Sequence, residues 1–171
     1  MIAGAIALTA MTGFAKAQLS PEWQSCTGKP GIDLDQQIKS CSALIQSGKE
    51  SNKNLAIAFG NRGIAHKSKG QYDRAIQDYD QAIKLEPTAV RYNNRGIAYS
   101  NKGEFNRAIQ DYDQAITLEP TAIHYNNRGT AYSNKGQYDR AIQDYDQAIK
   151  LDPNYTNAIN NRSKAAAKKN R

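Results

Sequence analysis

Residues 70–87 read GQYDRAIQDYDQAIKLEP, and almost the same stretch returns twice further along the chain. It recurs as GEFNRAIQDYDQAITLEP at 103–120 and as GQYDRAIQDYDQAIKLDP at 136–153. The segments between these blocks also repeat, with YNNRGIAYSNKG at 92–103 and YNNRGTAYSNKG at 125–136. The repeat period is 33 residues, measured from position 70 to 103 and from 103 to 136. A period of this length predicts an architecture of stacked structural repeats.

Each block has the apolar spacing of an amphipathic helix, close to i, i+3, i+4 and i+7, with Asp, Gln, Arg and Lys on the other face. In the first block the apolar side chains are Tyr72, Ala75, Ile76, Tyr79, Ala82, Ile83 and Leu85. Another helix is predicted before each block, because Lys-Gly at 69–70, 102–103 and 135–136 is typical of a helix end. The later helix is closed by Pro87, Pro120 and Pro153. Each unit is therefore predicted to be a helix hairpin.

The repeated units resemble the tetratricopeptide repeat family, whose pattern places aromatic residues, glycine, alanine and proline at fixed offsets. The matching positions are Phe59, Gly63, His66, Ala75, Tyr79, Ala82 and Pro87, then Tyr92, Gly96, Tyr99, Ala108, Tyr112, Ala115 and Pro120, then Tyr125, Gly129, Tyr132, Ala141, Tyr145, Ala148 and Pro153. The period also suits ankyrin repeats, but nothing here resembles their T-P-L-H block. The resemblance implies an all-α fold, a right-handed α-α superhelix (solenoid) of helix-turn-helix hairpins.

The ends of the chain depart from the repeat, as the capping units of a repeat array do. The predicted divisions are a degenerate N-terminal capping hairpin at 18–55, three repeats within 56–153 (approximately 56–88, 89–121 and 122–154) and a polar, basic C-terminal capping helix at 154–171.

The two cysteines, Cys26 and Cys41, lie in the predicted N-terminal cap. An even number of cysteines fits one disulfide in an oxidising compartment, where it would tie the two helices of the cap together. Closing a loop of about 15 residues is worth roughly 3 kcal/mol. The alternative is two buried free thiols. No metal site is predicted, because two cysteines with only His66 and His124 far away do not match the ligand spacing of zinc.

Residues 1–17 have the character of a signal peptide. The run from Met1 to Ala15 carries no charge and is rich in Ala, Ile, Leu and Met, and Ala15-Lys16-Ala17 is a small-x-small pattern that a signal peptidase could cut. The positively charged start of such a peptide is missing, since no Lys or Arg precedes the apolar run. The run is too short to cross a bilayer, so no stable membrane span is expected. We expect an exported bacterial protein, periplasmic or secreted.

An arginine stands before each helix glycine, where the tetratricopeptide pattern has leucine. These arginines are Arg62, Arg95 and Arg128, with Arg162 in the C-terminal segment. A cation at a usually apolar position needs a partner or a route to solvent. Three aspartates recur with the same period and are the predicted partners in a structural ladder of ion pairs. They are Asp78, Asp111 and Asp144. The alternative is direct contact with a ligand.

No catalytic signature occurs in the sequence. Gly-x-Ser-x-Gly, Gly-x-x-x-x-Gly-Lys and His-Glu-x-x-His are all absent. The DYD triplets at 78–80, 111–113 and 144–146 recur in every repeat, whereas a catalytic pair is normally unique. We therefore predict a protein that is not an enzyme and has no cofactor.

In tetratricopeptide arrays the first helices line a concave groove, and the resemblance implies the same here. The groove candidates are Asn61, Asn94, Asn127, Ile97, Thr130, Asn101 and Asn134, with Asn161, Ile64, Lys67, Ser100 and Ser133. A row of amides can hydrogen-bond the backbone of an extended peptide; the alternative is hydrogen bonding between helices of the array. The carboxylate clamp of some family members is matched at Asn94, but Gly60 and Ile64 replace its basic residue and its second asparagine.

The predicted function is a protein-interaction module that binds a protein or peptide segment in this groove. The alternative is an assembly scaffold that self-associates through its ends or its convex face. The formal net charge of +7 would also suit an acidic polymer, which predicts binding that weakens steeply with salt. Because the basic residues are spread along the chain rather than clustered on a face, no nucleic-acid partner is expected.

Overall fold

The computed structural model describes residues 20–170, and this part of the chain contains nine α-helices and no strand. The helices are α1 (Pro21–Cys26), α2 (Leu34–Gln46), α3 (Asn52–Ser68), α4 (Tyr72–Leu85), α5 (Ala89–Asn101), α6 (Phe105–Leu118), α7 (Ala122–Asn134), α8 (Tyr138–Leu151) and α9 (Thr156–Lys169). The predicted all-α solenoid of helix hairpins is confirmed. The predicted signal peptide lies outside the described residues.

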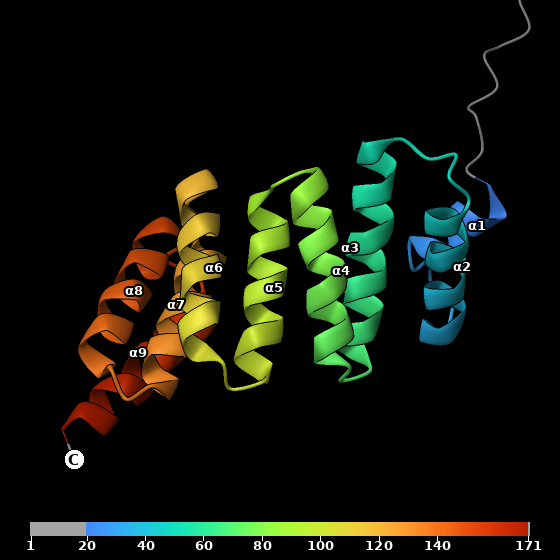
Figure 1. Cartoon of the computed structure of the whole chain (residues 1–171). Helices are drawn as coiled ribbons and strands as arrows, with labels where there is room; N and C mark the ends of the chain where they lie inside the picture. The colour runs from blue at the N-terminus through green and yellow to red at the C-terminus, as the bar shows by residue number, and fades with distance from the viewer. Residues whose placement is uncertain (1–19, 171) are drawn as a thin grey trace, which may run out of the picture.

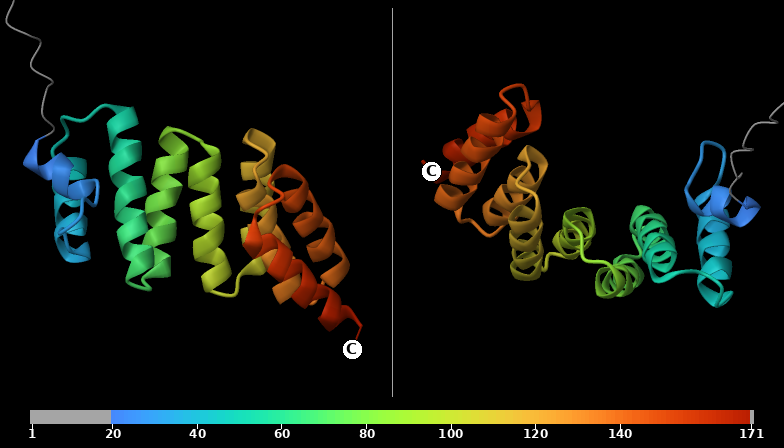
Figure 2. Two further views of the ribbon diagram at one scale, coloured as in Figure 1. Left: turned by 180° about the vertical axis from the view of Figure 1, so that it is seen from behind. Right: turned by 90° about the horizontal axis from the view of Figure 1, so that it is seen from above.

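The helices stack side by side into an elongated array, with α1 and α2 at one end and α9 at the other (Figure 1). The repeated hairpins are α3/α4, α5/α6 and α7/α8, and each helix packs mainly on its neighbours in the chain. Seen from above, the array follows an arc, with α3 and α5 toward the inner side and α4 toward the outer side (Figure 2). Such nearest-neighbour packing is what a repeat solenoid requires.

A glycine turn ends the first helix of each repeated hairpin. The backbone φ is 72° at Gly70, 79° at Gly103 and 75° at Gly136, in the left-handed region that favours glycine. In the first hairpin, the Gly70 N–H donates to the Lys67 carbonyl at 2.9 Å, and the Gln71 N–H donates to the His66 carbonyl at 2.9 Å. This is the Schellman arrangement, and it satisfies carbonyl groups that the helix end would otherwise leave unpaired.

The junction between successive hairpins is set by proline and threonine. Glu119 precedes a proline and is extended, with φ −153° and ψ 102°, because proline disfavours the helical conformation in the residue before it. Thr121 then caps α7, and its side chain accepts from the His124 N–H at 3.3 Å. Thr88 caps α5 in the same way. The first helix of each new hairpin thus begins at a defined residue.

Within each hairpin, a glycine of the first helix makes room for a tyrosine of the second. Tyr79, Tyr112 and Tyr145 are at most 2 % exposed. A Cβ on Gly63 would lie 2.8 Å from the Tyr79 ring, and one on Gly96 would lie 2.7 Å from the Tyr112 ring. Because only a hydrogen fits there, these glycines set the close approach of the paired helices.

The N-terminal cap is a short hairpin in which α1 is fastened to α2. A disulfide joins Cys26 to Cys41 with an S–S distance of 2.06 Å, and both residues are fully buried. Gln37 Nε2 donates to the Cys26 carbonyl at 3.1 Å, and Trp23 Nε1 donates to Glu50 at 3.0 Å. These contacts hold a helix of 6 residues, which is too short to be stable by itself.

Candidate functional site

The arginine before each helix glycine binds an aspartate on the second helix of the same hairpin. The distance between an Nη2 nitrogen and the carboxylate is 2.7 Å for Arg62–Asp78, 2.6 Å for Arg95–Asp111 and 2.6 Å for Arg128–Asp144. The Nε–H groups donate to the same carboxylates, at 3.0, 2.9 and 2.9 Å. The predicted partners therefore meet in bidentate ion pairs, the strongest geometry for this contact.

The remaining guanidinium nitrogen reaches the preceding unit of the array. Arg95 Nη1 donates to Asp80 at 2.7 Å, and Arg128 Nη1 donates to Asp113 at 2.6 Å. The first arginine donates instead to Ser42 Oγ of the cap at 2.9 Å. Both aspartates of a DYD triplet are thus used, one within the hairpin and one toward the next hairpin. Sequence reasoning missed the second aspartate, although its period was visible.

The ladder of ion pairs is partly buried. Burial raises the pKa of Asp111 and of Asp144 above its usual range, and the neighbouring guanidinium opposes that shift. Hydrogen bonds to these carboxylates raise the pKa of Arg95 and of Arg128. The charges of the ladder therefore satisfy one another within the array, which leaves little of them for a ligand.

A hollow of about 420 Å³ lies between α3 and α5. The residues that matter for its chemistry are Ile57, Gly60, Asn61, Ile64, Val90 and Asn94. Ile64 is 38 % exposed and Val90 is 58 % exposed, so apolar surface is open to a partner here. Two of the predicted groove amides, Asn61 and Asn94, line this one hollow.

In the later repeats, asparagines bond to one another. Asn127 Nδ2 donates to Asn93 Oδ1 at 2.8 Å, and Asn161 Nδ2 donates to Asn126 Oδ1 at 3.0 Å. The acceptors are buried, at 9 % and 6 % exposed. These amides therefore tie successive first helices together, which is the alternative that the sequence left open.

Gly60 interrupts this asparagine ladder at the first repeat. It occupies the position of Asn93 and Asn126, so Asn94 lacks the amide partner that Asn127 has in Asn93. A Cβ on Gly60 would meet nothing within 4 Å. In the part of the chain that the structure describes, neither Asn61 nor Asn94 makes a side-chain hydrogen bond. Their amides are free to bind a ligand.

The other predicted groove residues have different surroundings. Thr130 Oγ1 donates to the Asn126 carbonyl at 2.9 Å, and Ile97 packs against the buried core. Asn101 and Asn134 are exposed at the C-terminal ends of α5 and α7. None of these four adds a free group to the hollow, and peptide contact by them stays a prediction.

One of the three repeated tyrosine hydroxyls has no partner. The Tyr112 hydroxyl hydrogen-bonds with Ser100, and the Tyr145 hydroxyl donates to Thr130 Oγ1 at 3.3 Å. Tyr79 lines the hollow and is 0 % exposed, and its hydroxyl is the one unpartnered buried side-chain N or O atom of the described residues. Burial raises the pKa of this hydroxyl, so it keeps its proton at neutral pH. Such a group is unusual, because buried polar atoms are nearly always bonded.

The Tyr79 hydroxyl lacks a partner because of two residues on α3. Ile64 stands where the third repeat has Thr130, and Lys67 stands where the other repeats have Ser100 and Ser133. Both hydroxyl-bearing partners of the repeated tyrosine are therefore absent in the first repeat. Burial lowers the pKa of Lys67. Comparing the three repeats position by position would have revealed this difference. The sequence analysis considered only the residues that the repeats have in common.

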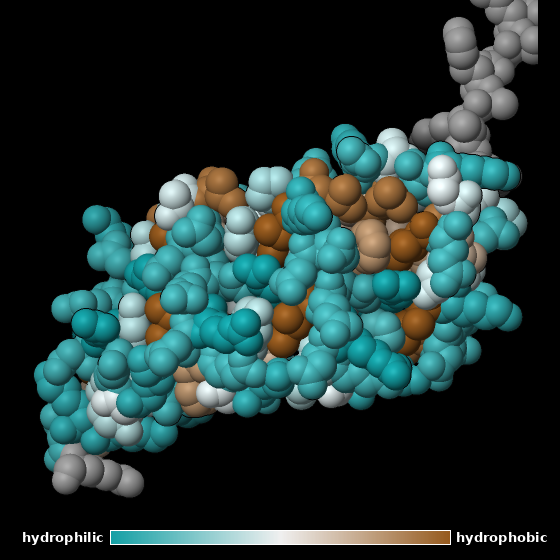
Figure 3. All heavy atoms as spheres, viewed as in Figure 1, coloured by the Kyte–Doolittle hydropathy of each residue, from teal (hydrophilic) through white to brown (hydrophobic). Residues whose placement is uncertain are grey.

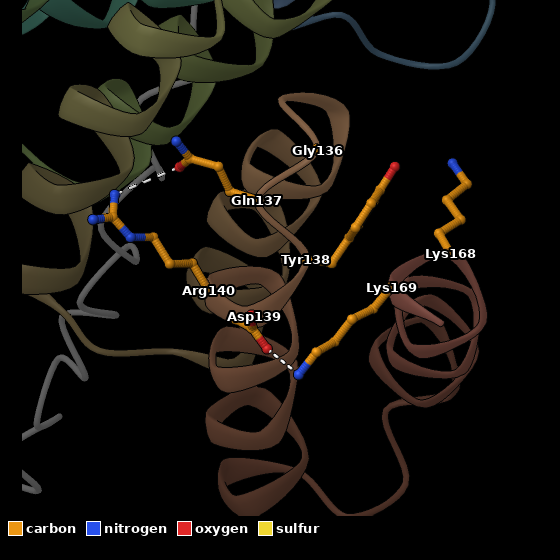
Figure 4. Close-up of a pocket in the computed structure, with 7 residues that line it drawn as sticks. All are labelled: Gly136, Gln137, Tyr138, Asp139, Arg140, Lys168 and Lys169. Atoms are coloured by element: carbon orange, nitrogen blue, oxygen red, sulfur yellow. Dashed lines mark hydrogen bonds and ion pairs between the residues drawn. The ribbon is translucent and has the colours of Figure 1, made fainter. Parts of the chain in front are cut away.

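A second kind of hollow lies at the turns inside the hairpins. Figure 4 shows the one at the α7–α8 turn, where residues 136–140 lie near the end of α9. Lys169 and Asp139 form an ion pair across it. Similar hollows occur at Gly70 and Gly103. Because this feature repeats at every such turn, it belongs to the scaffold rather than to a particular site.

Both histidines are occupied by structural contacts. His66 Nδ1 lies 2.7 Å from Gln71 Oε1, and His124 Nδ1 lies 2.8 Å from the Glu119 carbonyl. Within residues 20–170, no three His, Cys, Asp or Glu side chains gather where they could hold a metal ion. In the same range we find no helix with the length and apolar character needed to cross a membrane.

A curved stack of helix hairpins with an open hollow on its first helices defines a helical-repeat protein of the binding class. Residues 56–88, 89–121 and 122–155 each match the family model described as tetratricopeptide repeat. The chain belongs to the tetratricopeptide repeat family. Comparison with curated proteins gives no match.

Solved structures of the same fold include domains with bound peptides. The first TPR of Spaghetti (RPAP3) bound to HSP90 peptide SRMEEVD has 27 % identity and a TM-score of 0.65, with 67 % of this chain and 93 % of that chain covered. The second TPR domain of human RPAP3, in complex with HSP70 peptide SGPTIEEVD, has 30 % identity and a TM-score of 0.65, with 68 % and 98 % covered. The MamA protein has 23 % identity and a TM-score of 0.72, with 80 % and 74 % covered, and shows the fold alone.

Proposed function

We propose that this protein is a protein-interaction module, without catalytic activity, that binds an extended protein or peptide segment along its first helices. The observation that carries this function is the hollow between α3 and α5, where Asn61 and Asn94 have no side-chain partner. An amide offers both a donor and an acceptor, which matches the two polar groups of a peptide unit. The exposed Ile64 and Val90 beside them supply apolar contact.

Two related domains with bound HSP90 and HSP70 peptides support peptide recognition by this fold. The mode of recognition should nevertheless differ here. A carboxylate clamp needs a basic residue and two asparagines, and the present chain has Gly60 and Ile64 at two of those positions. We therefore propose recognition of an internal segment rather than of a chain end.

Capture of the natural partner tests this function. Two variants of the full chain would serve as bait beside the unmodified protein, Asn61→Ala/Asn94→Ala and the control Gln77→Ala/Gln110→Ala, which lies on the second helices α4 and α6. Loss of two hydrogen bonds should weaken binding about tenfold or more in the first variant. The control removes two exposed amides that do not lie on the first helices, and it should bind normally.

Equal capture by both double variants would refute a role for the hollow. If the protein captured only itself, the scaffold alternative would replace the proposed function. On the face seen in Figure 3, apolar side chains show only as separate patches among hydrophilic ones, which gives no extended surface there for self-association. Binding that fell steeply with salt in all three baits would instead indicate an acidic polymer.

We also propose that the protein is bacterial and works outside the cytoplasm. The disulfide between Cys26 and Cys41 supports an oxidising compartment, and the uncharged N-terminal run supports export. Fractionation of the source cells followed by intact-mass measurement tests this. We expect a periplasmic or secreted chain that starts at Gln18 and lacks two hydrogens relative to the reduced form. A reduced, full-length cytoplasmic chain would refute it.

A further inference from the structure

We propose that the hollow between α3 and α5 selects one uncharged carboxamide side chain, that of glutamine, from the bound segment. This selectivity rests on the peptide-binding function proposed above, and it specifies which side chain of the peptide the hollow binds. It is argued from two differences between the first repeat and the other two, and from the character of the side chains that line the hollow.

The first difference is space. Where the later repeats join Asn93 to Asn127 and Asn126 to Asn161, the first repeat has Gly60 and an open volume. A side chain from a ligand can therefore enter between α3 and α5. In the later repeats, a pair of bonded asparagines fills the corresponding space.

The second difference is the Tyr79 hydroxyl. By the equivalence of the repeats, this hydroxyl lies beside Ile64 and Lys67 on α3, where the third-repeat tyrosine meets Thr130 and Ser133. Because Tyr79 keeps its proton, its hydroxyl is a hydrogen-bond donor that needs an acceptor oxygen. The array supplies such an oxygen to each of the other two tyrosines and none to Tyr79. In the proposed complex, the side chain that enters beside Gly60 supplies this oxygen.

The third observation is the character of the lining. Ile57, Ile64 and Val90 are apolar, which suits the methylene groups of a side chain that reaches inward. The two charged residues of the lining neutralise each other, because Arg91 Nη2 lies 2.9 Å from Glu86 Oε2. An occupant with an aliphatic stem, an acceptor oxygen and no charge fits this lining. Glutamine has that combination, and its stem is longer than that of asparagine or threonine.

Three probes of similar size separate the possibilities. The N-acetyl, N′-methylamide forms of glutamine, glutamate and leucine imitate one internal residue of a peptide. Each would be titrated into the full chain labelled with ¹⁵N, and binding would be followed by the side-chain amide signals of Asn61 and Asn94. We expect the glutamine probe to bind about three- to tenfold more tightly than the leucine probe, the ratio that one hydrogen bond provides.

Variants assign this ratio to the hydroxyl. Tyr79→Phe should bring glutamine down to the affinity of leucine, and Ile64→Thr should do the same by giving Tyr79 an internal partner. Tyr112→Phe is the matched control, because it removes a hydroxyl that is already bonded to Ser100. It should leave the preference unchanged. Gly60→Asn should close the hollow to all three probes.

Each other outcome contradicts the proposal. Equal binding of glutamine and leucine, or an unchanged preference in Tyr79→Phe, would mean that the hydroxyl takes no part. Preference for glutamate that is lost in Lys67→Met would mean an anion site. No shift at Asn61 and Asn94 at the solubility limit of the probes would mean that the hollow selects no side chain. None of these results touches partner capture, so failure of the pocket stays distinct from failure of the groove.

Discussion

Two glycines in the interior of α3 test the packing argument within a single helix. Alanine gains about 1 kcal/mol of helix propensity over glycine at either position. A Cβ on Gly60 meets nothing within 4 Å, whereas a Cβ on Gly63 would lie 2.8, 3.0 and 3.1 Å from three atoms of the Tyr79 ring. The ring would have to withdraw by about half an ångström to reach ordinary contact, and Tyr79 is already 0 % exposed. Overpacking of this kind costs about 1–3 kcal/mol.

We therefore expect Gly60→Ala to raise the free energy of unfolding by about 0.5–1 kcal/mol and Gly63→Ala to lower it by about 1 kcal/mol. Urea unfolding followed by circular dichroism measures both. The difference between the two variants isolates the steric term, because both gain the same propensity. If Gly63→Ala proved as stable as Gly60→Ala, the glycine would not set the approach of α3 to α4, and the account of the hairpin would be wrong.

Three further predictions concern the ladder, the tyrosines and the cap. Arg128→Met should lower the free energy of unfolding by about 2–4 kcal/mol, because it leaves Asp144 buried without its cation, whereas Arg162→Met removes an exposed pair and should lower it by less than about 1 kcal/mol. Burial raises the pKa of Tyr79, Tyr112 and Tyr145, so the unfolded chain loses these protons first. Stability should therefore fall above pH 10, by at most about 1.4 kcal/mol per pH unit for each tyrosine. Urea titrations from pH 9 upward measure that slope, and Tyr112→Phe should make it shallower. Reduction of the disulfide should remove roughly 3 kcal/mol from the cap and expose its tryptophan, seen as a fluorescence change, while hydrogen exchange in α5–α8 stays slow.

Much of the fold could be predicted because the same local sequence signals occur in each of the three repeats. The Lys-Gly pairs, the prolines and the apolar spacing each specify a turn, a helix end or a buried face without reference to distant parts of the chain. The partners of the arginines could be named for the same reason. Asp78 and its equivalents recur in phase with the arginines, so period alone paired them.

The contacts between hairpins were harder to predict, because they depend on how far one unit is rotated against the next. Periodicity could not tell whether Asn127 would reach Asn93 or face solvent, since both arrangements have the same spacing. The bridge from Arg95 to Asp80 depends on the same rotation. For a similar reason all the groove candidates shared one predicted role, whereas the structure separates free amides from bonded ones.

The differences on α3 are better explained by binding than by folding. Glycine at position 60 costs about 1 kcal/mol of helix propensity, and an unpartnered buried hydroxyl on Tyr79 costs about 1–3 kcal/mol. The neighbouring cap does not require either feature, because Gly60 lines the hollow toward α5, whereas the apolar cluster of the cap includes Ala58 of α3. In the other repeats, the corresponding groups form hydrogen bonds within the array. Two features that lower stability at the same hollow are the pattern expected of a site selected for function rather than for stability.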